Sequence, residues 1–148
     1  MKIEEVVDLR ASFVRILVVD DFAPWQLFVQ TFLGQDPNLS IIGFASDGSE
    51  AVQKACELEP DLILMDIRLP GLSGIEAALQ IQQLAPQSAI LFLSQDSDPD
   101  VVHAALSAGG RGYVLKSKVA RDLVAGVEAV LGGKCFVSPG LVDGDDWT

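Results

Sequence analysis

The chain has 148 residues, of which 49% are hydrophobic and 21% are charged. This length and composition predict one globular domain that buries about two thirds of its unfolded surface and needs no disulfide or structural metal to fold. Ten basic and 21 acidic residues give a formal net charge of −11, which argues against a domain that binds a nucleic-acid backbone or an anionic membrane surface.

The cysteines and the histidine exclude several kinds of site. Cys56 and Cys135 lie far apart without CxxC spacing, and His103 is the only histidine, which argues against most zinc sites and against a histidine-based triad. No apolar run reaches the roughly 18 residues of a membrane span, and the first ten residues lack the pattern of a signal peptide. We expect a cytoplasmic protein with reduced thiols, in which Cys56 fills a core position.

The first half of the chain alternates predicted strands and helices. Three short apolar runs predict strands at residues 15–19, 39–45 and 62–65. Phe28 and Phe32 have helical spacing and indicate a helix after the first strand. Ala51 and Ala55 repeat that spacing after Asp47, which we assign as the N-cap of a helix between the second and third strands.

The second half continues this alternation. Two further apolar runs predict strands at residues 89–93 and 112–115. Ser73 begins a Ser-x-x-Glu capping box, so a helix should start near Gly74. Asp98 and Pro99 favour the start of another helix, which should end at the glycine pair 109–110. The last predicted helix has apolar residues at i, i+4, i+7 and i+8, namely Leu123, Val127, Val130 and Leu131.

This alternation predicts an α/β fold of the flavodoxin-like type. Most of the runs are continuously apolar, as strands are when helices cover both faces of a parallel sheet. We expect a doubly wound, five-stranded parallel sheet in the order 2-1-3-4-5 with right-handed crossovers. We also expect an N-terminal extension over residues 1–13, a single domain over 14–137, and an acidic tail or linker over 138–148.

Polar residues follow four of the five predicted strands. They are Asp20 and Asp21 after the first strand, Asp66 after the third, Ser94 after the fourth and Lys116 after the fifth. The carboxyl ends of parallel strands share one edge of the sheet, and ligands bind there where the strand order reverses. We therefore expect one pocket, in which Asp20 and Asp21 lie beside Asp66.

Three converging carboxylates need neutralising charges. Two like charges about 4 Å apart repel by roughly 4 kcal/mol at an effective dielectric constant near 20. Lys116 can offset one charge, and a hard divalent cation with oxygen ligands can offset two more. This description fits Mg²⁺ better than zinc or copper. We expect a backbone carbonyl just after Asp66, that of Arg68, to complete the protein ligands.

These segments resemble the receiver domains of two-component response regulators. The resemblance spans roughly residues 15–133 and rests on VVDD at 18–21, LMDIRLPG at 64–71, LS at 93–94 and GYVLK at 112–116. The continuation to the Ser-Pro pair at 138–139 is similar to the branch that usually precedes a LuxR-type helix-turn-helix. The 148 residues include no such DNA-binding domain.

The resemblance implies a phosphorylation switch. Asp66 would accept a phosphoryl group from a histidine kinase, and Asp20 and Asp21 would hold Mg²⁺ with it. Lys116 and Ser94 would bind phosphoryl oxygens, and an inward swing of Ser94 would let Tyr113 rotate from exposed to buried. The fourth helix, fifth strand and fifth helix would then present the readout surface to a downstream protein or to a second copy of the chain.

Three features depart from the pattern of this family. Gln95 follows Ser94 where a small residue is common, and a longer side chain there would narrow the entrance to Asp66. Ser117 follows Lys116 where many members carry a proline in a cis-bonded turn. Arg68 and Asp96 flank the path of hydrolytic water in this family, and we hypothesise that their opposite charges pair and slow dephosphorylation.

Two other functions remain open. A receiver that is never phosphorylated would act as a constitutive interaction module, and Gln95 is the best support for that alternative. A small hydrolase or phosphotransferase would also use an aspartate nucleophile with Mg²⁺, but such enzymes usually carry a second aspartate where Arg68 stands. Taken singly, Asp20 fits a helix N-cap and Lys116 a solvated charge. Their joint placement favours a signalling switch over an enzyme.

Overall fold

A computed structural model of the chain describes residues 13–141. Residues 1–12 and 142–148, which include nearly all of the predicted extension and most of the predicted tail, lie outside the described residues. The elements, in chain order, are β1 (Val14–Val19), α2 (Ala23–Leu33), β2 (Leu39–Ala45), α3 (Gly48–Leu58), β3 (Leu62–Met65), α4 (Gly74–Leu84), β4 (Ala89–Ser94), α5 (Pro99–Ser107), β5 (Gly112–Leu115), η1 (Lys116–Lys118), α6 (Val119–Leu131) and β6 (Phe136–Val137). No helix of the described part is long and apolar enough to cross a membrane.

The strands form one parallel sheet in the order β2-β1-β3-β4-β5-β6. The predicted order 2-1-3-4-5 is confirmed, but the predicted number of five strands is wrong. A sixth strand, β6, lies beyond β5 and pairs Phe136 with Gly112 and Val137 with Tyr113. Two residues are too few to produce an apolar run or a periodicity, so the pattern of the sequence did not reveal this strand.

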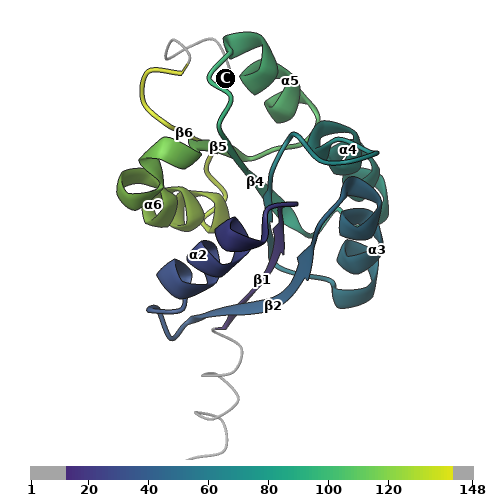
Figure 1. Ribbon diagram of the computed structural model, residues 1–148, viewed down its shortest axis with the longest axis horizontal. Coiled ribbons are helices and arrows are strands. Elements are labelled where there is room, and N and C mark those ends of the chain that lie inside the picture. The colour runs from purple at the N-terminus through teal and green to yellow at the C-terminus, as the bar shows by residue number, and fades with distance from the viewer. Residues whose placement is uncertain (1–12, 142–148) are drawn as a thin grey trace, which may run out of the picture.

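Helices cover both faces of the sheet, as predicted. Figure 1 shows α2 and α6 on one face and α3, α4 and α5 on the other. Side chains alternate along β1, so that Ile16 and Val18 pack toward α2 and α6, while Leu17 and Val19 pack toward the opposite helices. Because both faces are buried, every position of such a strand is apolar.

The predicted helix starts are confirmed by their caps. Asp47 Oδ1 accepts a hydrogen bond of 2.8 Å from the Glu50 amide at the start of α3. Ser73 and Glu76 form a reciprocal capping box at the start of α4, and the Asp98 side chain caps α5 ahead of Pro99. Each cap satisfies amide groups that the first turn of a helix leaves without partners.

Cys56 is exposed, so its predicted place in the core is wrong. The apolar stripe of α3 runs through Ala51 and Ala55, both fully buried. Successive residues of a helix are turned by about 100°, and Cys56 therefore points away from the stripe that its neighbour Ala55 belongs to. At the end of α6, Leu131 is likewise exposed, although its spacing placed it with the buried Leu123 and Val127.

The packed structure continues past residue 137. Ser138 is 1% exposed, and Leu141 belongs to the core cluster under α3, α4 and α5. The Ser138 amide donates a hydrogen bond of 2.9 Å to the carbonyl of Tyr113. Ser138 and Leu141 are therefore packed, whereas Pro139 and Gly140 between them are exposed, although the proline, glycine and acidic residues of this segment predicted a tail.

Candidate functional site

The site forms at the point where the strand order reverses. β1 is flanked by β2 and β3, and the last residues of β1 and β3, Val19 and Met65, lie opposite each other in the ladder. The next residue of each chain segment is an aspartate. The Asp66 amide donates a hydrogen bond of 3.0 Å to the carbonyl of Val19, so the ladder continues and holds Asp20 and Asp66 at the same edge.

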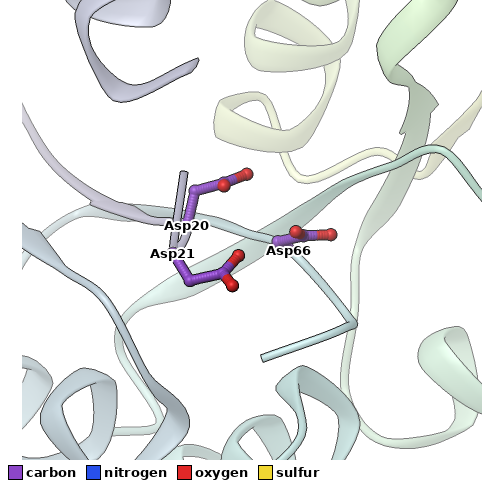
Figure 2. A group of neighbouring side chains, drawn as sticks. All are labelled: Asp20, Asp21 and Asp66. Carbon is purple, nitrogen blue, oxygen red and sulfur yellow. The ribbon is translucent and has the colours of Figure 1, made fainter. Parts of the chain in front are cut away.

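The three predicted carboxylates converge. One carboxylate oxygen from each of Asp20, Asp21 and Asp66 lies within 4.8 Å of the other two. Figure 2 shows the three side chains close together, two from adjacent positions after β1 and one from the end of β3. Asp20 and Asp66 are buried, whereas Asp21 is exposed. A cluster of oxygen donors that is open on one side suits a hard cation that keeps some of its water.

Lys116 faces this cluster. Its Nζ lies 2.5 Å from Asp20 Oδ2 and 3.3 Å from Asp66 Oδ2. The ring of Trp25 covers the same ammonium group, with 4.8 Å between Nζ and the ring centroid. The cluster contains three carboxylates and Lys116 supplies one ammonium group, so a surplus of negative charge remains, as the sequence predicts. This surplus favours a bound cation.

Asp66 carries the clearest electrostatic signature of the site. Its burial raises the pKa of the carboxyl group, Lys116 lowers it, and the nearby charge of Asp20 raises it again, so that the net shift is upward. Asp66 Oδ1 accepts a hydrogen bond of 2.8 Å from the amide of Ile67. The other oxygen, Oδ2, faces Lys116. Burial therefore disfavours the ionised form of Asp66, whereas the ammonium group of Lys116 favours it.

The site residues share one cavity of about 230 Å³. Its lining consists of Asp20, Asp21, Phe22, Asp66, Arg68, Ser94, Gln95 and Lys116. The structure therefore brings the residues predicted from the strand ends into a single pocket. Gln95 is exposed and lies at this pocket, next to the buried Ser94.

Tyr113 lies behind the pocket rather than in its lining. Its side chain is completely buried, and its hydroxyl donates a hydrogen bond of 2.7 Å to the carbonyl of Asp96. Burial raises the pKa of Tyr113 to about 12, so the hydroxyl keeps its proton near neutral pH. Ser94 Oγ accepts a hydrogen bond of 3.0 Å from the Asp96 amide. Asp96 thus connects Ser94 to Tyr113 through its own backbone.

The predicted pairing of Arg68 with Asp96 is present at the mouth of the pocket. Arg68 Nη2 lies 2.8 Å from Asp96 Oδ2. A hydrogen bond from the Asp98 amide and the neighbouring Arg68 guanidinium lower the pKa of Asp96. The opposite charges of Arg68 and Asp96 could be read from the sequence. The hydrogen bonds of the Asp96 amide and carbonyl to Ser94 and Tyr113 could not, because every residue type carries the same backbone groups.

Comparisons with known proteins give a family match and several relatives. The sequence pattern of the response regulator receiver domain matches residues 16–128. The transcriptional regulatory protein LiaR of Bacillus subtilis is 37% identical over 121 residues, which are 82% of this chain and 57% of LiaR. The response regulator protein VraR of Staphylococcus aureus is 33% identical over 126 residues, which are 85% of this chain and 60% of VraR. The chain thus spans less than two thirds of these relatives.

Two solved structures are similar over nearly the whole fold. A two-component response regulator of the LuxR family from Aurantimonas sp. SI85-9A1 is 33% identical with a TM-score of 0.84, covering 88% of this chain and 93% of that chain. The response regulator domain of Thermotoga maritima CheB is 31% identical with a TM-score of 0.76, covering 81% and 97%.

Proposed function

Because the chain belongs to the receiver domain family of two-component response regulators, in its LuxR-type branch, we propose that Asp66 accepts a phosphoryl group from a histidine kinase. The added charge would then switch the association of this domain with another protein. The observation that carries the proposal is that the carboxylates of Asp20, Asp21 and Asp66 and the ammonium group of Lys116 share one cavity.

The transfer step uses one oxygen of Asp66. Oδ1 is engaged by the Ile67 amide, so we assign Oδ2, which faces Lys116, as the nucleophile. Oδ2 forms a bond to the phosphorus of the kinase's phosphohistidine, the phosphorus–nitrogen bond breaks, and the histidine leaves and is protonated from solvent. The product is an aspartyl phosphate.

The acidic residues would hold Mg²⁺. Asp20, Asp21 and Asp66 supply carboxylate oxygens, and we assign the backbone carbonyl of Arg68 as a further ligand. When bound, the ion would supply positive charge that offsets the repulsion between the carboxylates and the incoming phosphoryl group. Lys116, which now faces Asp20 and Asp66, would pair with a phosphoryl oxygen as a point charge.

The switch would use Ser94 and Tyr113. A phosphoryl group adds about 1.5 to 2 negative charges and three acceptor oxygens. The Ser94 hydroxyl would donate a hydrogen bond to one of these oxygens. The hydrogen bond that Ser94 Oγ accepts from the Asp96 amide would then change. This change would reach Tyr113, because the Tyr113 hydroxyl donates a hydrogen bond to the carbonyl of the same Asp96. The readout surface would comprise α5, β5 and α6, and would present itself to a downstream protein or to a second copy of the chain.

Intact-mass measurement after incubation with Mg²⁺ and a small acyl phosphate tests the proposal. The wild-type protein should gain the mass of one phosphoryl group, and hydroxylamine should remove it, since it cleaves acyl phosphates and spares phosphate esters of serine. Asp66→Asn should gain nothing, while Asp61→Asn, at an exposed aspartate before β3, should behave as wild type. Modification of Asp66→Asn to the wild-type extent would overturn the assignment.

The same experiment judges the two alternatives. An unmodified wild-type protein would favour the constitutive interaction module, which the exposed Gln95 at the pocket supports; Gln95→Ala should then restore modification if that side chain blocks entry. Release of many equivalents of phosphate per protein would favour the hydrolase. A hydrolase of this kind usually has a second aspartate two residues after the nucleophile to act as acid and base. In this chain that position is Arg68, which forms an ion pair with Asp96.

A further inference from the structure

The segment after α6 is fastened to the end of β5 by a buried pair of side chains. Ser138 Oγ accepts a hydrogen bond of 3.1 Å from the amide of Leu115 and donates one of 2.8 Å to Asp122 Oδ2. Ser138 is 1% exposed and Asp122 is 4% exposed. Figure 1 shows β6, which leads into Ser138, next to β5 at the edge of the sheet. We call Ser138 and Asp122 the clasp.

The direction of the hydrogen bonds in the clasp is fixed by charge. The Arg121 guanidinium forms two bonds to the Asp122 carboxylate, of 2.7 and 2.8 Å. These bonds and that from Ser138 lower the pKa of Asp122, so the carboxylate stays ionised and can only accept. The hydroxyl proton of Ser138 therefore goes to Asp122, and its lone pairs remain free for the Leu115 amide.

The clasp acts one residue before Lys116. Leu115 is the last residue of β5, and the paired part of β6 ends at Val137. At the next position the ladder is replaced by the side chain of Ser138, which holds the Leu115 amide.

We infer that Ser138 and Asp122 are positioning residues for Lys116. They set where β5 ends, and thereby where the Lys116 side chain leaves the backbone toward Asp20 and Asp66. This inference rests on the proposed function of the site. It adds two residues to the site, one of which, Ser138, lies outside the segment that matches the receiver family.

The position of Lys116 can be measured without any phosphorylation. The ¹³Cε signal of Lys116 in the NMR spectrum reports how its ammonium group lies relative to the two carboxylates. Ser138→Ala removes the hydroxyl and should shift this signal and accelerate hydrogen exchange of the Leu115 amide. Ser138→Thr keeps the hydroxyl and should restore both. Ser107→Ala, at an exposed serine ending α5, is the matched control and should change neither.

Kinetics give the second readout. At saturating Mg²⁺, Ser138→Ala should be phosphorylated about 10- to 100-fold more slowly by a small acyl phosphate, the loss typical of a displacement near 1 Å. The Kd for Mg²⁺ should stay within about twofold, because Asp20, Asp21 and Asp66 are held by other strands. If Ser138 only stabilised the fold, Ser138→Ala would lower the thermal midpoint but would not slow phosphorylation selectively while leaving the Kd for Mg²⁺ unchanged.

The outcomes separate this inference from the proposed function. If folded Ser138→Ala has the wild-type Lys116 signal and the wild-type rate of phosphorylation, the positioning role of the clasp is overturned. The proposed role of Asp66 as phosphoacceptor is then unaffected. If the wild-type protein is not phosphorylated, the proposed function fails, and the Lys116 signal alone decides whether the clasp positions this lysine. Should Ser138→Ala not fold, Asp122→Asn, which keeps the shape and loses the charge, is measured in the same way, and an unshifted Lys116 signal there overturns the inference.

Discussion

The ammonium group of Lys116 is held by an aromatic ring as well as by carboxylates. The Trp25 ring lies 4.8 Å from Nζ, a geometry worth about 0.5–1 kcal/mol at an exposed site and more when water is excluded. Trp25→Leu should therefore slow phosphorylation of Asp66 by about two- to fivefold, as measured by mass spectrometry over time. Phe28→Leu, one turn further along α2 with its ring tilted against that of Trp25, is the control. Equal rates for the two variants would show that the ring over Lys116 has no special role.

A second prediction at the residue scale concerns Arg68, which lines the pocket. Arg68 and Asp96 form an ion pair whose arginine is mostly solvated, so the pair is worth at most about 1 kcal/mol. If it restricts the approach of water, Arg68→Ala should shorten the lifetime of the aspartyl phosphate by about two- to fivefold. The lifetime is measured after removal of the phosphodonor. Arg111→Ala, at an exposed arginine before β5, should leave it unchanged, and an unchanged lifetime in Arg68→Ala would sink the hypothesis.

At the scale of elements, α4 begins directly against the backbone of Asp66. A Cβ atom built on Gly74 would lie 1.9 Å from the backbone carbonyl oxygen of Asp66, a distance that no real contact reaches. Gly74→Ala should therefore displace the turn between β3 and α4, lower the free energy of unfolding by about 2–4 kcal/mol, and reduce phosphorylation of Asp66. Gly132→Ala, at the end of α6 where the nearest atom is 3.3 Å away, should cost less than about 1 kcal/mol. Urea denaturation checks both, and equal losses would contradict the steric argument.

Elements with a local signal were predictable, whereas pairings between distant segments were not. The convergence of Asp20, Asp66 and Lys116 followed from strand ends and sheet order, since a parallel sheet places those ends on one edge. The burial of Ser138 depends on Asp122 and Leu115, which lie 16 and 23 positions away in the chain. No periodicity encodes such a contact. The exposure of Cys56, in contrast, follows from its position one residue after Ala55 in α3. The prediction of a core position rested on the residue type alone and is wrong.

For the molecule as a whole, the site lowers the stability of the fold. Asp66 is buried beside the carboxylate of Asp20 and the ammonium group of Lys116, and its raised pKa means that the native state favours the protonated form. Below the unfolded-state pKa near 3.8, both states are protonated and Asp66 costs nothing. As the pH rises through the interval up to the native pKa, the unfolded chain loses its proton first and stability falls. Above that interval the cost is complete.

Asp66→Asn should accordingly be more stable than the wild-type protein at pH 7 by about 0.5–2 kcal/mol, the range common for a single stabilising substitution. The gain should shrink toward zero as the pH approaches about 4. Asp122, whose lowered pKa makes its own stabilisation vanish on acidification, is common to both proteins and cancels from the difference. Urea denaturation at several pH values without Mg²⁺ measures the gap, and added Mg²⁺ should narrow it by binding the native wild-type site. A variant less stable than wild type at pH 7, or a gap that widens on acidification, would show that Lys116 compensates the buried charge of Asp66 in full.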